Sequence, residues 1–354
     1  MKNIRAFRKQ LMGWYAGAKR DLPWRASRDP YRVWVSEIML QQTRSASAIG
    51  YYERFLRRFP TVRDLAAAEE DDVLALWSGL GYYRRARNLH AAARRIAAAG
   101  RFPANYEDLR ALPGVGPYTA AAIASIAFGL PHAVVDGNVS RIIARLINEQ
   151  GDVGSSVVRK RIQRVADRLL ERNAPGEFNQ AMMELGATIC APRSPRCGAC
   201  PVASWCEARK AGCADELPVR LSRAGVSEMQ TAVVVVQRAG RLLMRRRADS
   251  EARLPGFWDL PLVGEIAVVG EVCFQGTFRH SITNHRYVVQ VFSGKVRGAP
   301  RGFRWIPWAK LATLPVTSIA KKAIRHCHGK HPTGKGVSRS KGEAAECKQG
   351  EASG

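Results

Sequence analysis

Four cysteines stand close enough in the sequence to bind one metal centre. The segment CAPRSPRCGACPVASWC places their thiols at Cys190, Cys197, Cys200 and Cys206. A loop of this length could wrap four thiolates round a tetrahedral zinc ion or a [4Fe-4S] cluster, and the spacing alone does not separate the two. Because disulfides are rare in a reducing compartment, metal ligands are a better interpretation than disulfides or free thiols. The pattern therefore predicts a metal site.

Two carboxylic acids far apart in the sequence have surroundings suited to acid–base chemistry. Glu37 lies among apolar residues in RVWVSEIMLQQT. Burial there would raise the pKa of its carboxyl group, so that it could donate a proton near neutral pH. Asp136, in VVDGNV, follows an apolar run and precedes a predicted helix. The alternative for Glu37 is a solvent-facing position on a helix. The alternative for Asp136 is a helix N-cap, a structural role that can coexist with a catalytic one.

A glycine-rich turn is predicted to expose the start of a helix. In LPGVGPYTA, Gly114 and Gly116 permit close approach or a positive φ, and Pro117 suits the first helical position. The free N–H groups at such a helix start can bind a phosphate oxygen whatever base is attached to it. Tyr118 falls in the first turn of this helix. Residues 106–128 then form a helix-hairpin-helix unit, the alternative being a plain connection between helices.

The composition favours a nucleic-acid partner. The chain has 354 residues, enough for two domains and a tail, and 56 Lys and Arg against 30 Asp and Glu give it a net charge of +26. Such an excess of positive charge is typical of proteins that bind polyanions. The sequence shows no signal peptide and no apolar run of about 18 residues. We therefore expect a cytoplasmic protein without a membrane partner, associated with the nucleoid through its substrate, and we expect a monomer.

Helical periodicity dominates the first part of the chain. Leu, Ala, Arg and Glu recur at helical spacing and are interrupted by Gly, Pro, Asn and Asp. We predict an all-α domain over residues 1–208, with its metal-binding loop at 190–206. Its candidate helices lie near residues 31–47, 49–58, 70–78, 84–98, 106–111, 117–128, 138–147, 156–173 and 178–189.

The pattern changes after the cysteines. Residues 209–228 have no clear period and contain several helix breakers, which is typical of a linker. TAVVVVQ, RLLMRRR and RYVVQVFSGKV are rich in β-branched residues, with a hairpin turn at Ala239–Gly240 and a closing helix in PVTSIAKKAIRHC. We predict a small α+β domain over 229–328. Residues 329–354 are rich in Gly, Ser, Lys and Glu, which predicts a disordered tail.

Seven motifs in order resemble one group of DNA repair enzymes. LPWR, VSEIMLQQT, GLGYYRRARNL, LPGVGPYTA, VDGNVSR, FNQAMMELG and the cysteine spacing cover nearly all of the first 206 residues. They resemble the helix-hairpin-helix base-excision glycosylases of the endonuclease III superfamily and, within it, the adenine DNA glycosylases. The resemblance implies a [4Fe-4S] cluster rather than zinc. It also implies a DNA-binding cleft between a helical lobe and the lobe that holds the cluster.

The resemblance implies catalytic roles for four residues. Glu37 would protonate the leaving adenine, and Asp136 would lie beside C1′ of the sugar, where its charge stabilises an oxocarbenium-like transition state or bonds to it transiently. Asn138 would orient Asp136 or water. Tyr118 stands where endonuclease III has a nucleophilic lysine. The resemblance therefore implies hydrolysis by water, with little or no AP lyase activity and with Tyr118 packed against the sugar.

The resemblance also implies which residues extract and read the base. A base turned out of the stack leaves a gap that must be propped. Gln42 and Tyr82 resemble the family residues that wedge into the duplex, while an amide in the adenine pocket could read a base edge. Packing within the protein is the alternative for each. The implied DNA- and base-binding residues of the first domain are Trp24, Arg25, Gln42, Thr43, Leu80, Tyr82, Gly114, Gly116 and Gln180.

The second predicted domain resembles the Nudix-like domain of the same family, which senses 8-oxoguanine opposite the adenine. LLMRRR and LPGFWDLP carry the match. After LVGE comes IAVVGEVCFQG, without the acidic run that binds magnesium in Nudix hydrolases, so the resemblance implies recognition without hydrolysis. Where the family often has a Phe-Ser-His turn, this chain has RHSITNHRYVV. Thr283, Asn284 and His285 are its candidates to contact the lesion.

Three functions are consistent with these features. The first is a DNA repair glycosylase that hydrolyses the N-glycosidic bond of adenine mispaired with 8-oxoguanine or G in double-stranded DNA. The second, an endonuclease III-like glycosylase for oxidised pyrimidines, is opposed by Tyr118 and by the extra domain. The third is a non-catalytic DNA-binding iron–sulfur sensor, which would have no use for Glu37, Asp136 or a base pocket.

Overall fold

The computed structural model describes residues 3–221, 227–248, 250–251, 253–282 and 285–328. Its contacts divide the chain into two compact units. The first unit is Met1–Val73 with Tyr82–Arg223, and the second is Leu74–Gly81 with the described part of Ala224–Gly354. The tail predicted to be disordered, 329–354, lies outside the described residues.

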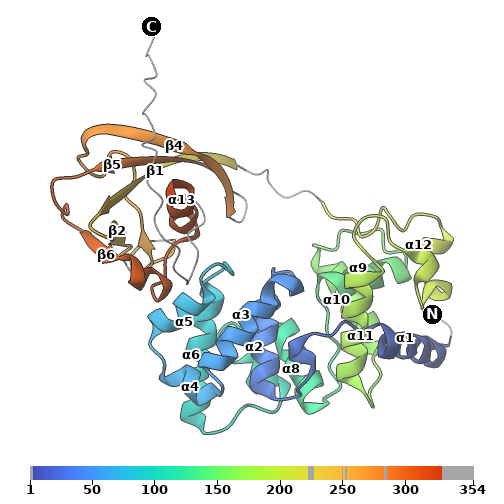
Figure 1. Ribbon diagram of the computed structural model, residues 1–354. Helices are drawn as coiled ribbons and strands as arrows, with labels where there is room; N and C mark the ends of the chain where they lie inside the picture. Colours follow the sequence, from blue (N-terminus) through green and yellow to red (C-terminus); the bar gives the residue numbers. More distant parts are fainter. Residues whose placement is uncertain (1–2, 222–226, 249, 252, 283–284, 329–354) are drawn as a thin grey trace. The chain divides into compact units, whose positions relative to one another are not determined.

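The chain up to residue 221 is built from helices, as its periodicity predicts (Figure 1). Short 3-10 turns at Pro23–Arg25, Cys197–Ala199 and Ala203–Trp205 accompany them. The α-helices are α1 (Ile4–Ala18), α2 (Pro30–Leu40), α3 (Ser45–Arg58), α4 (Val62–Ala67), α5 (Glu70–Trp77), α6 (Arg84–Ala99), α7 (Tyr106–Arg110), α8 (Pro117–Phe128), α9 (Gly137–Leu146), α10 (Ser156–Leu169), α11 (Pro175–Thr188) and α12 (Glu207–Lys210).

Several helix boundaries differ from the sequence prediction. The single helix predicted over 31–47 is wrong: α2 and α3 are separate, because the chain turns at Gln42, which has a φ of 57°. The helix predicted over 156–173 ends at Leu169. The next helix begins earlier than predicted, at Pro175, because proline fits the first turn, where no N–H partner is needed.

Three helices of the described chain up to residue 221, α1, α4 and the four-residue α12, fall outside the predicted segments. Helix α1 is amphipathic and buries Phe7, Leu11 and Tyr15. Helix α4 is short but is fixed by a capping box, in which Thr61 and Asp64 each accept a hydrogen bond from the other's backbone N–H. Helix α4 has six residues, which is too short for a helical period to be recognised in the sequence. The capping box is therefore the better sequence signal for this helix.

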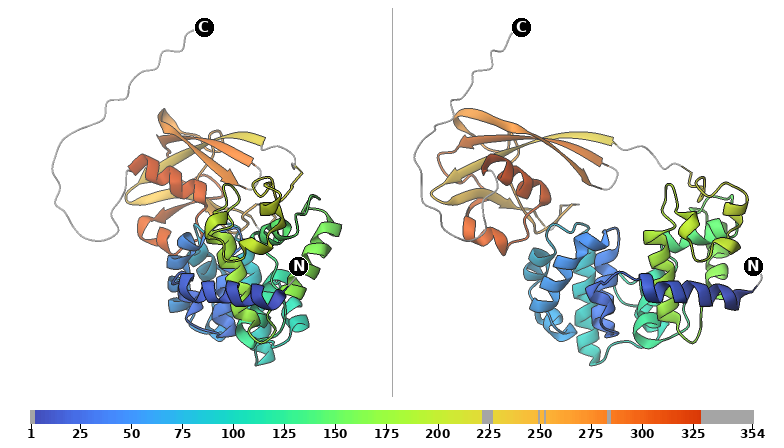
Figure 2. Two further views of the ribbon diagram at one scale, coloured as in Figure 1. Left: turned by 90° about the vertical axis from the view of Figure 1, so that its right-hand side faces the viewer. Right: turned by 45° about the vertical axis from the view of Figure 1, so that its right-hand side comes forward.

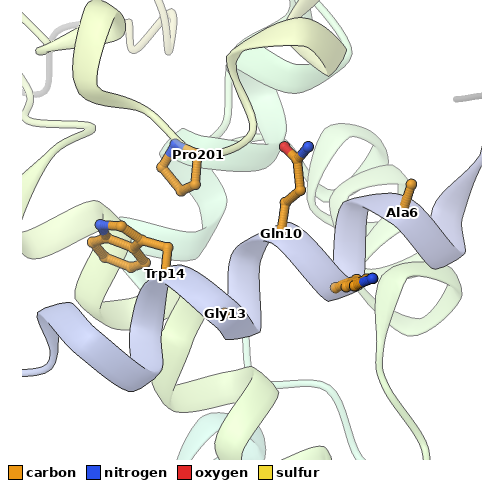
Figure 3. Close-up of a pocket in the computed structure, with 6 residues that line it drawn as sticks. Ala6, Gln10, Gly13, Trp14 and Pro201 are labelled. Carbon is orange, nitrogen blue, oxygen red and sulfur yellow. The ribbon is translucent and has the colours of Figure 1, made fainter.

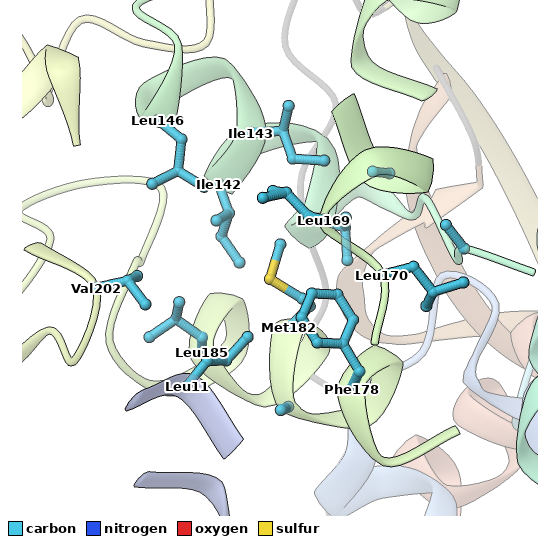
Figure 4. Packing of buried hydrophobic residues seen from close by; sticks show 14 of the residues in the cluster. Leu11, Ile142, Ile143, Leu146, Leu169, Leu170, Phe178, Met182, Leu185 and Val202 are labelled. Carbon is cyan, nitrogen blue, oxygen red and sulfur yellow. The ribbon is translucent and has the colours of Figure 1, made fainter. Parts of the chain in front are cut away.

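Helices α1, α9, α10 and α11 pack around one apolar core (Figure 4). Leu11, Ile142 and Met182 contribute to it from α1, α9 and α11, and Val202 joins it from the cysteine segment. Burying one such aliphatic side chain contributes roughly 1.5–3 kcal/mol. The core therefore fixes α9, and Asp136 at its start, against α11 and the cysteines.

Helices α7 and α8 form the predicted helix-hairpin-helix unit. Gly114 has a φ of 76°, and a Cβ atom there would lie 2.6 Å from Cβ of Asn88, so the turn requires glycine. Gly116 has an extended backbone and open space around it. It precedes Pro117 as the N-cap of α8, and no side chain caps this helix start. The first N–H groups of α8 are therefore left for a ligand.

The second unit contains a mixed sheet and one long helix (Figures 1 and 2). The strand order is β3-β2-β1-β5-β4, with β6 also paired to β2; among the strands that the structure describes, β1 and β5 pair in parallel and the other pairs are antiparallel. The elements are β1 (Ser227–Arg238), β2 (Arg241–Arg246), β3 (Trp258–Asp259), β4 (Val269–Ile282), β5 (His285–Lys295), β6 (Phe303–Pro307) and α13 (Ser318–His328).

The predicted α+β character of this region is confirmed. Ala239 and Gly240, with φ of 46° and 70°, form the predicted hairpin turn between β1 and β2. Helix α13 covers one face of the sheet through Ala320 and Ile324, which join the core that contains Val233. Throughout the described ranges, the helices are all too short or too polar to span a bilayer.

Candidate active site

Glu37 lies on α2 and is only 4% exposed. The helix is fixed at its start by Pro30 and by Asp29, whose side chain accepts a hydrogen bond from the N–H of Arg32. Burial raises the pKa of Glu37 to about 7, the nearby charge of Asp136 adds to the rise, and a hydrogen bond opposes it. The predicted buried acid is therefore present.

Tyr118 supplies the hydrogen bond that opposes the rise in the pKa of Glu37. Its hydroxyl donates to Oε2 of Glu37 over 2.5 Å. Burial raises the pKa of Tyr118 well above its ordinary value, and the charges of Glu37 and Asp136 add to the rise. The phenol therefore keeps its proton and acts as a donor to Glu37. The opening turn of α8 thus faces the carboxyl group on α2.

Asp136 is the N-cap of α9 and also belongs to the charge environment of Glu37. Its Oδ1 accepts a hydrogen bond from the N–H of Val139 at 2.7 Å, and its Oδ2 accepts one from Nδ2 of Asn138 at 3.1 Å. Burial raises the pKa of Asp136 above its ordinary value. These hydrogen bonds and the charge of Arg141 oppose the rise without cancelling it. The capping role and the placement beside Glu37 therefore coexist.

Asn138 is held from two sides. Its Oδ1 accepts a hydrogen bond from Nη2 of Arg141 at 2.8 Å, and the same nitrogen donates to the carbonyl of Gly186 at 2.8 Å. A Cβ atom on Gly186 would lie 2.5 Å from Cβ of Asn138. Helix α11 can therefore approach the start of α9 this closely only because residue 186 has no side chain.

One of the predicted base-binding residues, Arg25, is bonded to a carboxylate that the sequence analysis did not identify. Glu184 on α11 has a fully buried side chain and accepts hydrogen bonds from Nε of Arg20 at 2.6 Å and Nη2 of Arg25 at 2.7 Å. Burial acts to raise the pKa of Glu184, but these hydrogen bonds outweigh it and keep the pKa below its ordinary value. The sequence feature that could have identified Glu184 is its place in the motif FNQAMMELG.

Two further predicted base-binding residues, Trp24 and Gln180, contact aromatic residues. Arg25 lies over the ring of Tyr15, whose hydroxyl donates to Oε1 of Gln180 at 3.2 Å. Trp24 is buried and contacts Tyr52 edge-on, so it packs within the protein as the alternative interpretation has it. The structure therefore links Arg25 and Gln180 through Tyr15.

The residues predicted to wedge into DNA differ in exposure. Tyr82 is 45% exposed, and its φ of 50° is unusual for a side chain of this size. Gln42 has a φ of 57° in the turn after α2, and Thr43 follows it. Leu80 is buried. Beside this turn, Nε2 of Gln41 donates to Oγ1 of Thr119 at 3.1 Å and ties the end of α2 to α8.

The four predicted metal ligands lie near one another. Cys190, Cys197, Cys200 and Cys206 are partly buried and form no disulfides. Burial raises the pKa of Cys200 to about 11, and charges on the other three sulfurs add to the rise. Within the described ranges, no group of three or more His, Cys, Asp or Glu side chains is arranged to hold a single metal ion.

N–H groups are directed at these sulfurs. Nη1 of Arg145 donates to Sγ of Cys190 at 3.1 Å, and the backbone N–H of Val202 bonds to Cys200. Arg145 is buried and also donates to the carbonyl of Ala191 at 2.7 Å. Four cysteines with N–H donors to their sulfurs are the donor set that a [4Fe-4S] cluster uses. The residues present therefore fit such a cluster.

The predicted lesion-contacting residues of the second unit are described only in part. Thr283 and Asn284 lie outside the described residues. His285 begins β5, and its Nδ1 lies 2.6 Å from Oγ of Ser227 on β1. His285 is partly exposed.

An open hollow of about 460 Å³ lies between α1 and the cysteine segment (Figure 3). Trp14 and Gln10 of α1 and Pro201 face it. Neither Glu37 nor Asp136 lines the hollow. The hollow is therefore separate from the acid–base residues.

Comparison with known proteins decides the family. Residues 35–168 match the HhH-GPD superfamily of base excision DNA repair proteins. The adenine DNA glycosylase of Homo sapiens is 34% identical over 411 aligned residues, which cover 93% of this chain and 75% of the human protein. The chain belongs to the adenine DNA glycosylase family. The family member from Buchnera aphidicola subsp. Schizaphis graminum is 33% identical and covers 70% of this chain and 72% of its own.

Solved structures share the fold of the first unit. A thermostable thymine-DNA glycosylase superposes with a TM-score of 0.53 at 30% identity and covers 59% of this chain and 97% of its own. Endonuclease III in a non-covalent DNA complex superposes with a TM-score of 0.50 at 23% identity, over 60% of this chain and 99% of its own. The likeness to adenine DNA glycosylases inferred from the seven motifs is confirmed, and the family match spans Glu37, Tyr118 and Asp136.

Proposed function

We propose that the protein hydrolyses the N-glycosidic bond of adenine opposite 8-oxoguanine or G in double-stranded DNA. One observation carries the proposal: Glu37 is a buried acid with a pKa of about 7, bonded to Tyr118 and subject to the charge of Asp136. Perturbed carboxyl groups that act on each other are typical of acid–base sites. Membership of the adenine DNA glycosylase family supports adenine as the base that is removed.

Glu37 and Asp136 have separate roles in this reaction. Adenine leaves poorly as an anion, so Glu37 donates its proton to the departing base, an effect worth about 10²- to 10⁴-fold. Positive charge then develops on the sugar, and the carboxylate of Asp136 stabilises it. Asn138 and the N–H of Val139 fix the direction of that carboxylate. Water completes the hydrolysis.

The surroundings of Glu37 support base release without strand cutting. A lyase of this superfamily needs an amine that forms a Schiff base with the sugar. Tyr118 is a phenol that keeps its proton. The lysines described in the first unit, which are Lys9, Lys19, Lys160 and Lys210, have no hydrogen bond or ion pair to Glu37, Tyr118 or Asp136 among those found.

Cys190, Cys197, Cys200 and Cys206 would hold a [4Fe-4S] cluster. When bound, the cluster supplies iron–thiolate bonds that cross-link the segment after α11. Arg145 donates to one of the sulfurs and, with the core residue Val202, holds that segment against α9. The free N–H groups at the start of α8 and the net charge of +26 support contact with DNA phosphates.

The second predicted domain, 229–328, would recognise 8-oxoguanine as a Nudix-like domain without hydrolase activity, and residues 209–228 would link it to the glycosylase domain, 1–208. The mixed sheet covered by α13 supports an α+β recognition domain. His285, together with Thr283 and Asn284, would contact the lesion.

A single-turnover assay tests the function. Duplexes would carry A opposite 8-oxoguanine, A opposite G, or an oxidised pyrimidine, and borohydride trapping would be measured in parallel. We expect adenine release from the first two duplexes and little trapping. Glu37→Gln should bind the duplex but release adenine at least about 100-fold more slowly, while Glu53→Gln, at an exposed position of α3, should match the wild type.

Three results would contradict the proposal. Full activity of Glu37→Gln would remove the proposed acid. Preference of the wild type for oxidised pyrimidine, or efficient trapping, would indicate an endonuclease III-like enzyme. DNA binding without release of any base would indicate a sensor.

A further inference from the structure

Arg85, in the first turn of α6, directs its guanidinium group at the end of α2. Nη1 donates to the carbonyl oxygens of Ile38 at 2.9 Å and Met39 at 3.1 Å, and also to that of Gln41. Nη2 donates to Oγ1 of Thr43 at 3.4 Å. Carbonyls in the last turn of a helix have no N–H partner within the helix, and a cation there is favourable. Arg85 thus closes the end of α2.

The same arginine contacts Tyr82. Its guanidinium carbon lies 5.3 Å from the centre of the tyrosine ring, and its backbone N–H donates to the carbonyl of Tyr82 at 2.9 Å. One side chain therefore joins two short segments about 40 residues apart in the chain. These segments carry Gln42 and Tyr82.

Both Gln42 and Tyr82 have a backbone conformation that needs support. Their φ values of 57° and 50° lie in the left-handed region, which side chains other than glycine, asparagine and aspartate rarely adopt. Such conformations persist where the surrounding structure imposes them. The side chain of Arg85 fixes the carbonyl of Gln41 directly before Gln42 and packs on the ring of Tyr82, whereas the bond to the Tyr82 carbonyl comes from the backbone.

We propose that Arg85 is a positioning residue that sets Gln42 and Tyr82 at the spacing needed to enter the duplex together. The proposal rests on the proposed function, since it takes these two side chains to prop the gap left by the adenine. It requires arginine in particular, because a guanidinium group can serve several carbonyls and a ring at once, whereas an ammonium group is a point donor.

Base unstacking tests the proposal without requiring catalysis. A duplex with A opposite 8-oxoguanine would carry 2-aminopurine next to the adenine, and its fluorescence on mixing with enzyme would report unstacking. Arg85→Gln should slow both unstacking and single-turnover adenine release by about 10- to 100-fold, as misplaced groups do. Arg85→Lys should recover only part of this loss. Arg101→Gln removes one charge at an exposed position of the same unit and should match the wild type.

A mutant cycle separates positioning from general loss of structure. If Arg85 acts through the wedge residues, adding Arg85→Gln to Gln42→Ala with Tyr82→Ala should cost little further rate. An adenine without a pairing partner needs no wedge, so Arg85→Gln should excise it at nearly the wild-type rate. A fully additive effect, or equal slowing on paired and unpaired adenine, would overturn the proposal.

Two further outcomes are distinguishable. Helix α2 also carries Glu37, so a shift in the pH at which Arg85→Gln loses activity would mean that Arg85 acts on the acid, and would overturn the positioning role. If the wild type released no adenine, the proposed function would fail, whereas the unstacking signal would still report whether Arg85 sets Gln42 and Tyr82.

Discussion

Glu37 is subject to two influences that act on its pKa in opposite directions. Burial disfavours the carboxylate, and the hydroxyl of Tyr118 favours it by donating a hydrogen bond. The resulting pKa of about 7 leaves a substantial fraction of Glu37 protonated at neutral pH and still acidic enough to give up the proton. The hydrogen bond from Tyr118 therefore limits how far burial raises the pKa of Glu37.

The pH dependence of adenine release should follow these two groups. Release needs Glu37 protonated, so its rate should fall as the pH rises above about 7. Tyr118→Phe removes the hydrogen bond that stabilises the carboxylate, which raises the pKa of Glu37. The alkaline limb should then move to higher pH in single-turnover profiles recorded from about pH 5 to about pH 9. A limb that moved to lower pH would contradict this assignment.

The same burial should reduce the stability of the free protein. A carboxyl group whose pKa is raised on folding contributes stability that is present at low pH and lost as the pH rises through its folded pKa. For Glu37 this window runs from its ordinary value of 4.5 to about 7. At about pH 8, Glu37→Gln should therefore raise the free energy of unfolding by up to about 3 kcal/mol.

Denaturant unfolding at two pH values measures this effect. The stability difference between wild type and Glu37→Gln should shrink toward zero at about pH 4.5, where both side chains are uncharged. Glu53→Gln, at an exposed position, should change stability little at either pH. A Glu37→Gln variant less stable than the wild type at high pH would show that the carboxylate stabilises the fold.

Sequence reasoning reached the residues whose local surroundings are apolar or whose motif is distinctive. The apolar neighbours of Glu37 predicted its burial, and the glycine turn singled out Tyr118, but their hydrogen bond depends on two helices 81 residues apart. Glu184 was missed because its partners, Arg20 and Arg25, are about 160 residues away. A helical glutamate without visible partners is ordinarily assigned to the surface.

At the scale of elements, the helix-hairpin-helix turn depends on one of its two glycines. Gly114 has a positive φ and lies against Asn88, while Gly116 has an ordinary backbone and free space. From the motif alone, both glycines are predicted to need a backbone conformation that other residues avoid. The turn that places Tyr118 at the start of α8 therefore has a single conformational requirement.

Alanine substitutions at the two glycines should have different effects on stability. Gly114→Ala forces a side chain into a left-handed conformation and against Cβ of Asn88, which should cost about 1–3 kcal/mol. Gly116→Ala should cost less, at most about 1 kcal/mol, because alanine is a poorer N-cap than glycine but its methyl group meets open space and an ordinary backbone here. Denaturant unfolding of both variants measures the contrast. Equal losses would contradict the assignment of the strain to Gly114.

The elements themselves were largely predictable, and the exceptions have local causes. The hairpin at Ala239–Gly240 was found because its two turn residues stand between β-branched runs. The break between α2 and α3 was missed because Gln42 is not a turn-forming residue. Its left-handed backbone is held by surrounding contacts, including that of Arg85 with Gln41, and these are invisible in the sequence.

At the scale of the whole molecule, chemistry and lesion preference are expected to lie in different units. Glu37, Tyr118 and Asp136 all belong to the first unit, and His285 belongs to the second. A change in the second unit should therefore alter which base opposite the adenine is preferred, with little effect on release of the base once it is bound.

His285→Ala tests this division. It should lower the ratio of adenine release opposite 8-oxoguanine to that opposite G by about tenfold, the loss expected from one polar contact. The ratio would be measured from single-turnover rates with enzyme in excess over the duplex but below saturation, and rates at saturating enzyme should change little. Gln290→Ala, at an exposed position of the same strand, serves as the control. An unchanged ratio would remove His285 from lesion recognition.

The absence of a side chain at Gly186 has a consequence for interpreting natural variation. A glycine replaced by alanine within a helix is ordinarily read as harmless or even stabilising. Here the added methyl group would meet Asn138 at 2.5 Å and push α11 away from the start of α9, where Asp136 lies beside Glu37 in the candidate site. A variant 50 residues from that aspartate in the chain should be classed with those of the catalytic centre.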